Sequence, residues 1–162
     1  DFSIPYLSVT LAVVAKKSDN IHKVSDLNGK KLLTIHDTNS AIWANKNPNI
    51  TNVNCNTNRE CFDMLVEGEA DAYMHNIVNV ATIPLLNDEY EVGIGRVGQV
   101  LFDCVATQKG NHDLIHIIDE KILDLANQGY FHNEYTKTFE PFYKGTVDEK
   151  LFILEDIYEA FQ

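Results

Sequence analysis

The hydrophobic and polar positions of the chain follow two periods, one typical of β-strands and one typical of α-helices. Leu7 to Lys16 is rich in Val, Thr and Leu and alternates in polarity, which predicts a strand. Lys31 to Ile35 is a short apolar run that predicts a second strand. Four further segments have strand character: Ile50 to Cys55, Ala70 to Met74, Tyr90 to Val97 and Val100 to Thr107.

Helical patterns lie between these strands. Thr38 to Asn45 is predicted as a helix, with Asn39 or Ser40 as its cap. The sequence Thr57-Asn58-Arg59-Glu60 is a capping box that predicts the start of a second helix. Gly68 stands where the end of that helix favours a residue with positive φ.

The second half of the chain is predicted to be mainly helical. Ile77 to Leu86 is expected to form a helix capped by Asn76. An apolar stripe from Leu114 to Leu125 predicts a longer helix that ends at Gly129. A second capping box, 146–149, predicts a terminal helix with Leu151, Leu154, Tyr158 and Phe161 on one face. Strands that alternate with helices indicate an α/β sheet with a parallel core.

Polar residues follow two of the predicted strands directly. The segment 36–40 (His-Asp-Thr-Asn-Ser) comes after Ile35, and His75 and Asn76 come after Met74. Ligands of open α/β sheets gather at the carboxyl ends of strands, where helix N-termini supply free N–H groups. We therefore expect both polar segments to face one shared crevice and to bind a polar ligand.

The charge and hydropathy of the chain exclude several classes of partner. Acidic residues number 24 against 13 lysines and arginines, so the net charge is −11. Such a surface repels phosphate backbones and anionic lipid, so we expect neither nucleic acid nor an anionic membrane surface as a partner. No apolar run approaches the roughly 20 residues that span a bilayer.

Other motifs have weaker interpretations. Of the three cysteines, Cys55 and Cys61 are close enough to pair, but a role as small apolar core residues is the favoured interpretation. The sequence 93–98 (Gly-Ile-Gly-Arg-Val-Gly) fits a dinucleotide-binding pattern, but the next segment reads as a strand instead of a helix. His112 and His116 could share a helix face as metal ligands, yet nothing nearby completes the set, so we expect no metal and no cofactor.

An ordered set of segments resembles the polar-amino-acid solute-binding family of type 2 periplasmic binding proteins. The segments that carry the resemblance are Asp1-Phe2-Ser3-Ile4-Pro5-Tyr6, Val24-Ser25-Asp26-Leu27-Asn28-Gly29-Lys30, Glu67-Gly68-Glu69-Ala70-Asp71-Ala72, Gln108-Lys109-Gly110-Asn111 and Tyr135-Thr136-Lys137-Thr138-Phe139. The resemblance covers nearly the whole chain.

This resemblance implies an α/β Venus-flytrap fold whose two lobes close on an amino acid. It assigns residues 1–6 to a first hinge strand, 7–100 to lobe 2, and 101–162 to a second hinge strand and the C-terminal helical part of lobe 1. The N-terminal part of lobe 1 has no counterpart in this sequence. The apolar stripe from Leu114 to Leu125 would then lack a sheet to cover it, so we expect a homo-oligomer or a swapped dimer.

The resemblance also implies a set of ligand-binding residues. Thr38 matches a threonine that meets the ligand carboxylate, whereas Asp37 stands where the family has glycine. Asn76 stands where the family has the aspartate that receives the ligand ammonium, and His75 precedes it. Tyr6 could stack on a ligand. The candidate ligand-binding residues are Thr38, Asn39, Ser40, His75, Asn76, Asp37 and Tyr6.

The predicted function is the binding of an amino acid or a similar small polar solute for import by an ABC permease. The protein is expected in the periplasm or outside the cell, with a lipid anchor on the precursor. One alternative is a ligand-sensing module of a membrane receptor or kinase. Another is an enzyme like the cyclohexadienyl dehydratases, with His36, Asp37 or His75 as a general acid or base.

Overall fold

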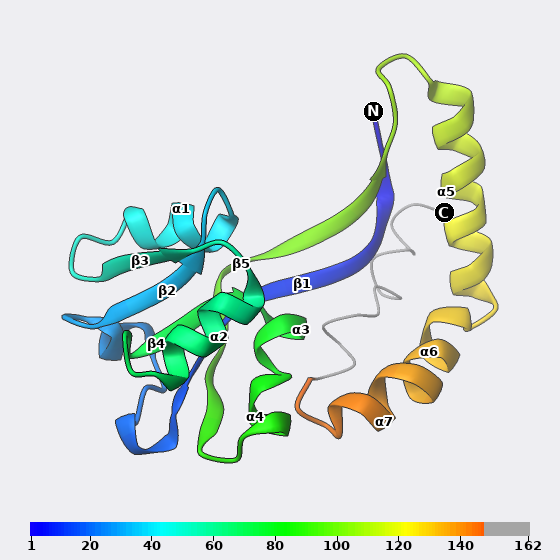
Figure 1. The fold of residues 1–162 in the computed structure, drawn as a ribbon. Helices are drawn as coiled ribbons and strands as arrows, with labels where there is room; N and C mark the ends of the chain where they lie inside the picture. The colour runs from blue at the N-terminus through cyan, green and yellow to red at the C-terminus, as the bar shows by residue number, and fades with distance from the viewer. Residues whose placement is uncertain (148–162) are drawn as a thin grey trace. The chain divides into compact units, whose positions relative to one another are not determined.

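The strands of the described residues form one mixed five-stranded sheet. The computed structural model describes residues 1–147, and the sheet has the strand order β3-β2-β4-β1-β5 (Figure 1). The strands are β1 (Phe2–Lys16), β2 (Lys31–Ile35), β3 (Thr51–Cys55), β4 (Ala72–Asn76) and β5 (Tyr90–Ala106). The sheet confirms the predicted α/β class.

Three neighbouring strands of this sheet run in the same direction. β2 pairs in parallel with β3 and with β4, whereas β1 pairs antiparallel with β4. The carboxyl ends of β2 and β4 therefore lie at the same edge, and the register of the antiparallel pair places Leu11 of β1 opposite Asn76. Segment 36–40, which follows β2, starts from this edge, and His75 and Asn76 are the last two residues of β4 there instead of following the strand as predicted.

Short helices connect the strands, and a longer helix follows the sheet. The α-helices are α1 (Asn39–Asn45), α2 (Asn58–Val66), α3 (Ile77–Val80), α4 (Ile83–Leu86), α5 (His112–Asn127), α6 (Tyr130–Glu134) and α7 (Glu140–Tyr143). Two 3-10 helices, η1 (Lys17–Asp19) and η2 (Val24–Leu27), and a π-helix, η3 (Tyr135–Phe139), complete the secondary structure of residues 1–147. In the part of the chain that the structure describes, no helix has the length and apolarity needed to cross a membrane.

The chain divides into two compact units. Among the described residues, one unit contains residues 10–99, and the other contains residues 1–9 and 100–147. The core of the 10–99 unit is formed by side chains with little or no exposed surface, among them Val13, Leu33, Tyr73, Met74 and Val80. The assignment of hinges and lobes to these segments stays a prediction.

Contacts between the chain's N-terminal residues and β5 and α5 hold the second unit together. The N-terminal ammonium of Asp1 donates to the Thr107 carbonyl at 3.1 Å, and the Ile4 N–H donates to an oxygen of Asp119 at 2.8 Å. Ile122 of α5 is buried, and the apolar residues packed against it are Ile4, Ile118, Leu123, Ala126 and Phe131. The predicted stripe of α5 is thus partly covered, whereas Leu114 remains exposed.

Several predicted boundaries are wrong. The first strand begins at Phe2, and the two predicted strands between Tyr90 and Thr107 are one strand. The predicted helix 77–86 is two short helices, with Pro84 near the start of the second. The cap of α1 is Thr38, since its hydroxyl oxygen accepts from the Ala41 N–H. The predicted terminal helix, with Leu151, Leu154, Tyr158 and Phe161 on one face, lies outside the described residues, and so does the second half of its capping box 146–149.

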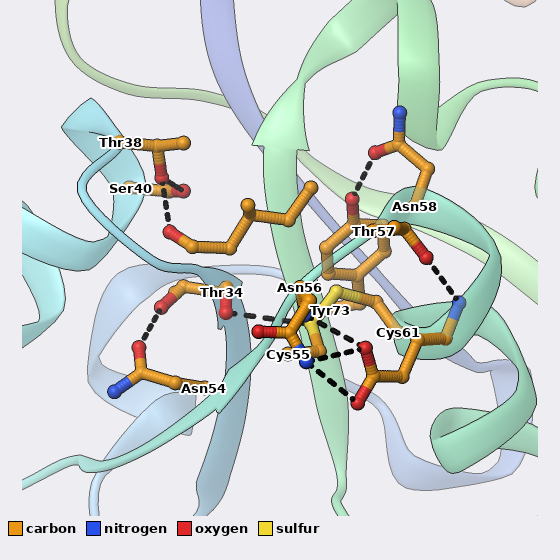
Figure 2. The surroundings of a disulfide bond; sticks show 12 residues. Thr34, Thr38, Ser40, Asn54, Cys55, Asn56, Thr57, Asn58, Cys61 and Tyr73 are labelled. Atoms are coloured by element: carbon orange, nitrogen blue, oxygen red, sulfur yellow. Dashed lines mark hydrogen bonds between the residues drawn. A yellow bond between two sulfur atoms is a disulfide. The ribbon is translucent and has the colours of Figure 1, made fainter.

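The favoured interpretation of two cysteines is also wrong. Cys55 and Cys61 form a disulfide that links the end of β3 to α2, with their Cα atoms 5.5 Å apart (Figure 2). Both residues are fully buried, so they do belong to the core, but as a covalent link. A separation of six residues does not decide between the two interpretations. Whether the two Cβ atoms come close enough for a disulfide depends on how the chain turns from β3 into α2.

The glycine-rich segment 93–98 lies within β5 and does not precede a helix. This excludes the dinucleotide pattern, which needs a helix N-terminus to receive a pyrophosphate. The presence of glycine at position 93 is explained by packing, because a Cβ at this position would overlap the carbonyl oxygen of Ile21. The glycine therefore permits close approach of two backbone segments.

Candidate functional site

A depression of about 250 Å³ lies at the carboxyl ends of β2 and β4. We call it the strand-end pocket, and its lining residues are Leu11, Asp37, Thr38, Asn39, Ser40, His75 and Asn76. The pocket lies within the 10–99 unit. The two polar segments that the sequence singled out are thus brought together, because their parent strands are parallel neighbours.

The first side of the pocket is a tight turn that leads from β2 into α1. Asp37 has a φ of 58°, in the left-handed region where glycine is favoured and where aspartate is one of the better tolerated alternatives. The next residue, Thr38, caps α1 with its hydroxyl oxygen. The position where the resemblance places a glycine therefore has a left-handed backbone in this chain and carries a carboxylate.

Hydrogen bonds within this turn use both of its hydroxyl protons. The Thr38 hydroxyl donates to the Ile35 carbonyl at 2.7 Å (Figure 2). Its oxygen lies 2.8 Å from that of Ser40, so the Ser40 hydroxyl is the donor of this second bond (Figure 2). Ser40 is only 1% exposed, which fixes this arrangement in the protein.

The disulfide supports the same turn. Sγ of Cys55 lies 3.4 Å from the carbonyl oxygen of Thr34 in β2 (Figure 2). One residue after β2, the His36 N–H donates to the Cys55 carbonyl at 3.2 Å. Cys55 is bonded to Cys61 in α2, so the turn that carries Asp37 and Thr38 starts beside a residue that the disulfide holds.

The second side of the pocket contains His75 and Asn76 at the end of β4. Asn79 donates its side-chain amide to Nδ1 of His75 at 2.7 Å, which places the ring proton on Nε2. Partial burial lowers the pKa of His75 below the usual histidine value. The imidazole is therefore held neutral, and Asn76 makes no side-chain cap bond to α3.

The charge of the pocket follows from these residues. Asp37 carries its one carboxylate, His75 is neutral, and the remaining lining residues have uncharged side chains. No lysine or arginine lines the pocket. The pocket therefore presents hydrogen-bonding groups and a single negative charge.

Two residues considered from the sequence lie elsewhere. Tyr6 is part of β1 in the other unit, is 38% exposed and is not among the lining residues. His36 is exposed and is also not among them. Of the candidate ligand-binding residues, all except Tyr6 share the strand-end pocket.

A second depression, of about 230 Å³, was not predicted from the sequence. Its lining residues are Asn58, Arg59, Phe62, Tyr73, Asn79, Thr82, Ile83 and Leu86. The Tyr73 hydroxyl donates to Asn58 at 2.5 Å, and burial raises the pKa of Tyr73 (Figure 2). These residues come from α2, β4, α3 and α4, and no local motif links segments so far apart in sequence.

The described residues 1–147 contain no group of three or more His, Cys, Asp or Glu side chains that could hold a metal ion. His112 lies 3.7 Å from an oxygen of Asp1, and His116 lies 3.4 Å from an oxygen of Glu120. Each histidine thus has a carboxylate neighbour at the protein surface.

The chain is similar to binding proteins for amino acids. It is 27% identical over 150 residues to the L-glutamate/L-aspartate-binding protein of Pseudomonas aeruginosa, covering 86% of this chain and 48% of that relative. It therefore spans about half the length of this curated relative. The chain matches no protein-family profile.

Solved structures show the same likeness. The solute receptor for L-cysteine of Neisseria gonorrhoeae has a TM-score of 0.82 at 30% identity, covering 94% of this chain and 62% of that one. The cysteine-binding protein of Campylobacter jejuni has a TM-score of 0.82 at 28% identity, covering 95% and 62%. The likeness confirms the type 2 periplasmic-binding-protein fold, of which this chain contains a part.

Proposed function

Starting from a partial type 2 periplasmic-binding-protein fold and its likeness to amino-acid-binding proteins, we propose that this chain binds an amino acid or a similar small polar solute. The strand-end pocket supplies one side of the binding site. The observation that carries the proposal is the meeting of segments 37–40 and 75–76 around one pocket of about 250 Å³.

The groups of this pocket suit a small zwitterionic or polar ligand. The N–H groups of Asn39 and Ser40 in the first turn of α1 have no intrahelical acceptor, so they can donate to a ligand oxygen. The amide of Asn76 can donate and accept, and the Asp37 carboxylate can accept. Leu11 gives the pocket an apolar side.

We place the protein outside the cytoplasm, as a solute-binding partner of an ABC permease. The Cys55–Cys61 disulfide supports this location, because disulfides persist in oxidising compartments such as the periplasm. The names of the relatives describe receptors and binding proteins for amino acids, which supports solute binding over the sensing module and the dehydratase. A lipid anchor on the precursor is part of the same proposal.

Self-association of this chain also remains a proposal. Leu114 and Ile117 of α5 are 41% and 62% exposed, and exposed apolar side chains on one helix favour contact with a second copy. Light scattering after size-exclusion chromatography measures the mass of the particle in solution, and a mass above that of one copy is expected.

A panel titration followed by NMR tests the binding proposal. The ¹⁵N-labelled chain is titrated with L-cysteine, L-glutamate, L-aspartate, L-glutamine and L-arginine. We expect one of these amino acids to shift the amide signals of residues 37–40 and 75–76 with a saturable dose dependence. Binding should be weak, because the longer relatives contain parts of the fold that this chain does not.

A variant and a control sharpen this test. Asn76→Ala removes an amide from the pocket and should weaken the binding, whereas Asn56→Ala removes an exposed amide outside the lining set and should not. If no amino acid of the panel shifts the pocket signals, or if both variants bind equally, the proposed function is wrong.

A further inference from the structure

The strand-end pocket contains an unusual distribution of charge for a site that binds an amino acid. Its one charged side chain is the Asp37 carboxylate, which lies on the α1 side of the pocket. On the β4 side, His75 and Asn76 are uncharged. The position of this carboxylate decides which end of a zwitterionic ligand the α1 side attracts.

The hydroxyl groups beside Asp37 offer little to a ligand carboxylate. The Thr38 proton is donated to Ile35 and the Ser40 proton to Thr38. The Thr38 oxygen also accepts from the Ala41 N–H at 3.4 Å. Neither hydroxyl therefore has a proton left for an anion. The donors that remain on this side are the side-chain amide of Asn39 and the N–H groups of Asn39 and Ser40, and none of them carries a charge that would offset the charge of Asp37.

The β4 side offers a ring donor and a neutral amide, and it has no negative charge for a cation. Nδ1 of His75 accepts from Asn79, so the free ring position is the Nε2–H. Because its pKa is lowered, this ring contributes a hydrogen bond and no charge. The side-chain amide of Asn76 does not ionise, so it also carries no charge.

We propose that Asp37 is the binding group for the ammonium of the ligand, so that the cationic end of the ligand lies at the turn between β2 and α1. The ligand carboxylate then lies towards the Nε2–H of His75 and the amide of Asn76. This inference rests on the proposed function and gives the ligand its direction in the pocket. It makes cationic amines, including amino-acid amides, better ligands of this chain than carboxylates without an ammonium.

The left-handed backbone at Asp37 makes the test variants usable. Asn tolerates positive φ as Asp does, so Asp37→Asn removes the charge and keeps the turn. Asp37→Gly removes the side chain and fits the same φ of 58°, so it checks that the effect comes from the carboxylate.

A matched control removes a carboxylate at the opposite edge of the sheet. Glu69 is exposed and precedes the start of β4, whereas the pocket lies at the end of that strand. Glu69→Gln changes the net charge by the same amount as Asp37→Asn. It separates a contact at the pocket from the general attraction of an acidic protein for cations.

Two probes of similar size and opposite charge distinguish the two directions of binding. L-alaninamide keeps the ammonium and lacks the carboxylate, and N-acetyl-L-alanine keeps the carboxylate and lacks the ammonium. Each is titrated into the ¹⁵N-labelled chain and its variants at constant ionic strength. We expect L-alaninamide to shift the signals of residues 37–40, and Asp37→Asn and Asp37→Gly to weaken this binding about fivefold, as for a partly exposed ion pair.

The outcomes separate the inference from the proposed function. The inference is overturned if N-acetyl-L-alanine shifts residues 37–40 as strongly as L-alaninamide does. It is also overturned if Asp37→Asn and Glu69→Gln bind L-alaninamide equally, even when an amino acid of the panel shifts the pocket. A pocket that no amino acid shifts contradicts the proposed function itself.

Discussion

At the scale of single residues, Asp37 combines a left-handed backbone conformation with a negatively charged side chain. Its φ of 58° is a conformation that glycine adopts freely and that aspartate tolerates better than most residues. The resemblance identified the replacement of glycine, but only the structure shows that the backbone conformation is left-handed and that the carboxylate lines the pocket. Sequence patterns do not report φ, so the left-handed conformation could not be predicted, although Asp37 was among the candidate ligand-binding residues.

Substitutions at Asp37 test its backbone conformation. Asp37→Ala should lower the free energy of unfolding by about 1 kcal/mol, because an alanine at positive φ places its Cβ too close to the following carbonyl. Asp37→Gly should leave the free energy unchanged or raise it slightly. Urea denaturation of both variants measures the difference, and equal stability of Ala and Gly would show that the turn is not held in this conformation.

Burial of the His75 ring is expected to make the stability of the fold depend on pH. Burial lowers its pKa in the folded chain, so the unfolded chain binds more protons at pH values just below the usual histidine pKa of about 6.5. The free energy of unfolding should therefore fall as the pH falls from about 6.5 towards the folded-state pKa. His75→Gln should make this dependence shallower.

Urea denaturation between pH 7.5 and 5 measures that dependence. His36→Gln serves as the control, since His36 is an exposed histidine outside the lining set. If the two variants show the same slope of free energy against pH, burial of the His75 ring does not contribute to stability.

At the scale of elements, local patterns predicted the strands that surround the pocket. Lys31–Ile35 has the predicted bounds, and Thr57 caps α2 as the capping box indicated, with its oxygen accepting from the Glu60 N–H at 3.1 Å. The failures arise from tertiary contacts. Tyr90–Ala106 is one strand through Gly98, because pairing within the sheet overrides the glycine signal.

Substitution of Gly93 in β5 is expected to lower the stability of the fold strongly, even when the added group is small. Gly93→Ala should destabilise the fold by about 1–3 kcal/mol or more, because the added methyl group overlaps the Ile21 carbonyl and the backbone must move. Gly95→Ala is the matched control, since a Cβ there meets nothing within 4 Å. Thermal or urea denaturation compares them, and similar losses in both variants would contradict the close approach.

The disulfide predicts a loss of stability on removal. The double variant Cys55→Ala, Cys61→Ala should lower the free energy of unfolding by about 2 kcal/mol, the expectation for a short closed loop. Cys104→Ala is the control, because Cys104 is a free cysteine. Denaturation with and without a reductant measures the effect, and an unchanged midpoint in the double variant would show that the link is dispensable.

At the scale of the whole molecule, parallel pairing of β2 and β4 creates the site. Segments 36–40 and 75–76 are about 35 residues apart in sequence, and only the sheet order brings them together. An α/β pattern with a parallel core was enough to predict this meeting, since carboxyl ends of parallel neighbours share an edge. The second pocket could not be predicted, because Tyr73 and Leu86 carry no motif that relates them.

The net charge of −11 also acts at this scale. An acidic surface attracts cations and repels anions over roughly 10 Å at moderate ionic strength. This field favours ligands whose cationic end approaches first, in agreement with the direction of binding proposed for Asp37. It acts on every part of the surface, which is why a charge-matched control variant accompanies that test.

Intermolecular NOEs between a bound amino acid and the methyl groups of the chain locate the ligand directly. We expect NOEs from the ligand to the methyl groups of Leu11 and Thr38, which line the strand-end pocket. NOEs to Ile83 and Leu86 in the second pocket, with none to Leu11 or Thr38, would contradict this expectation.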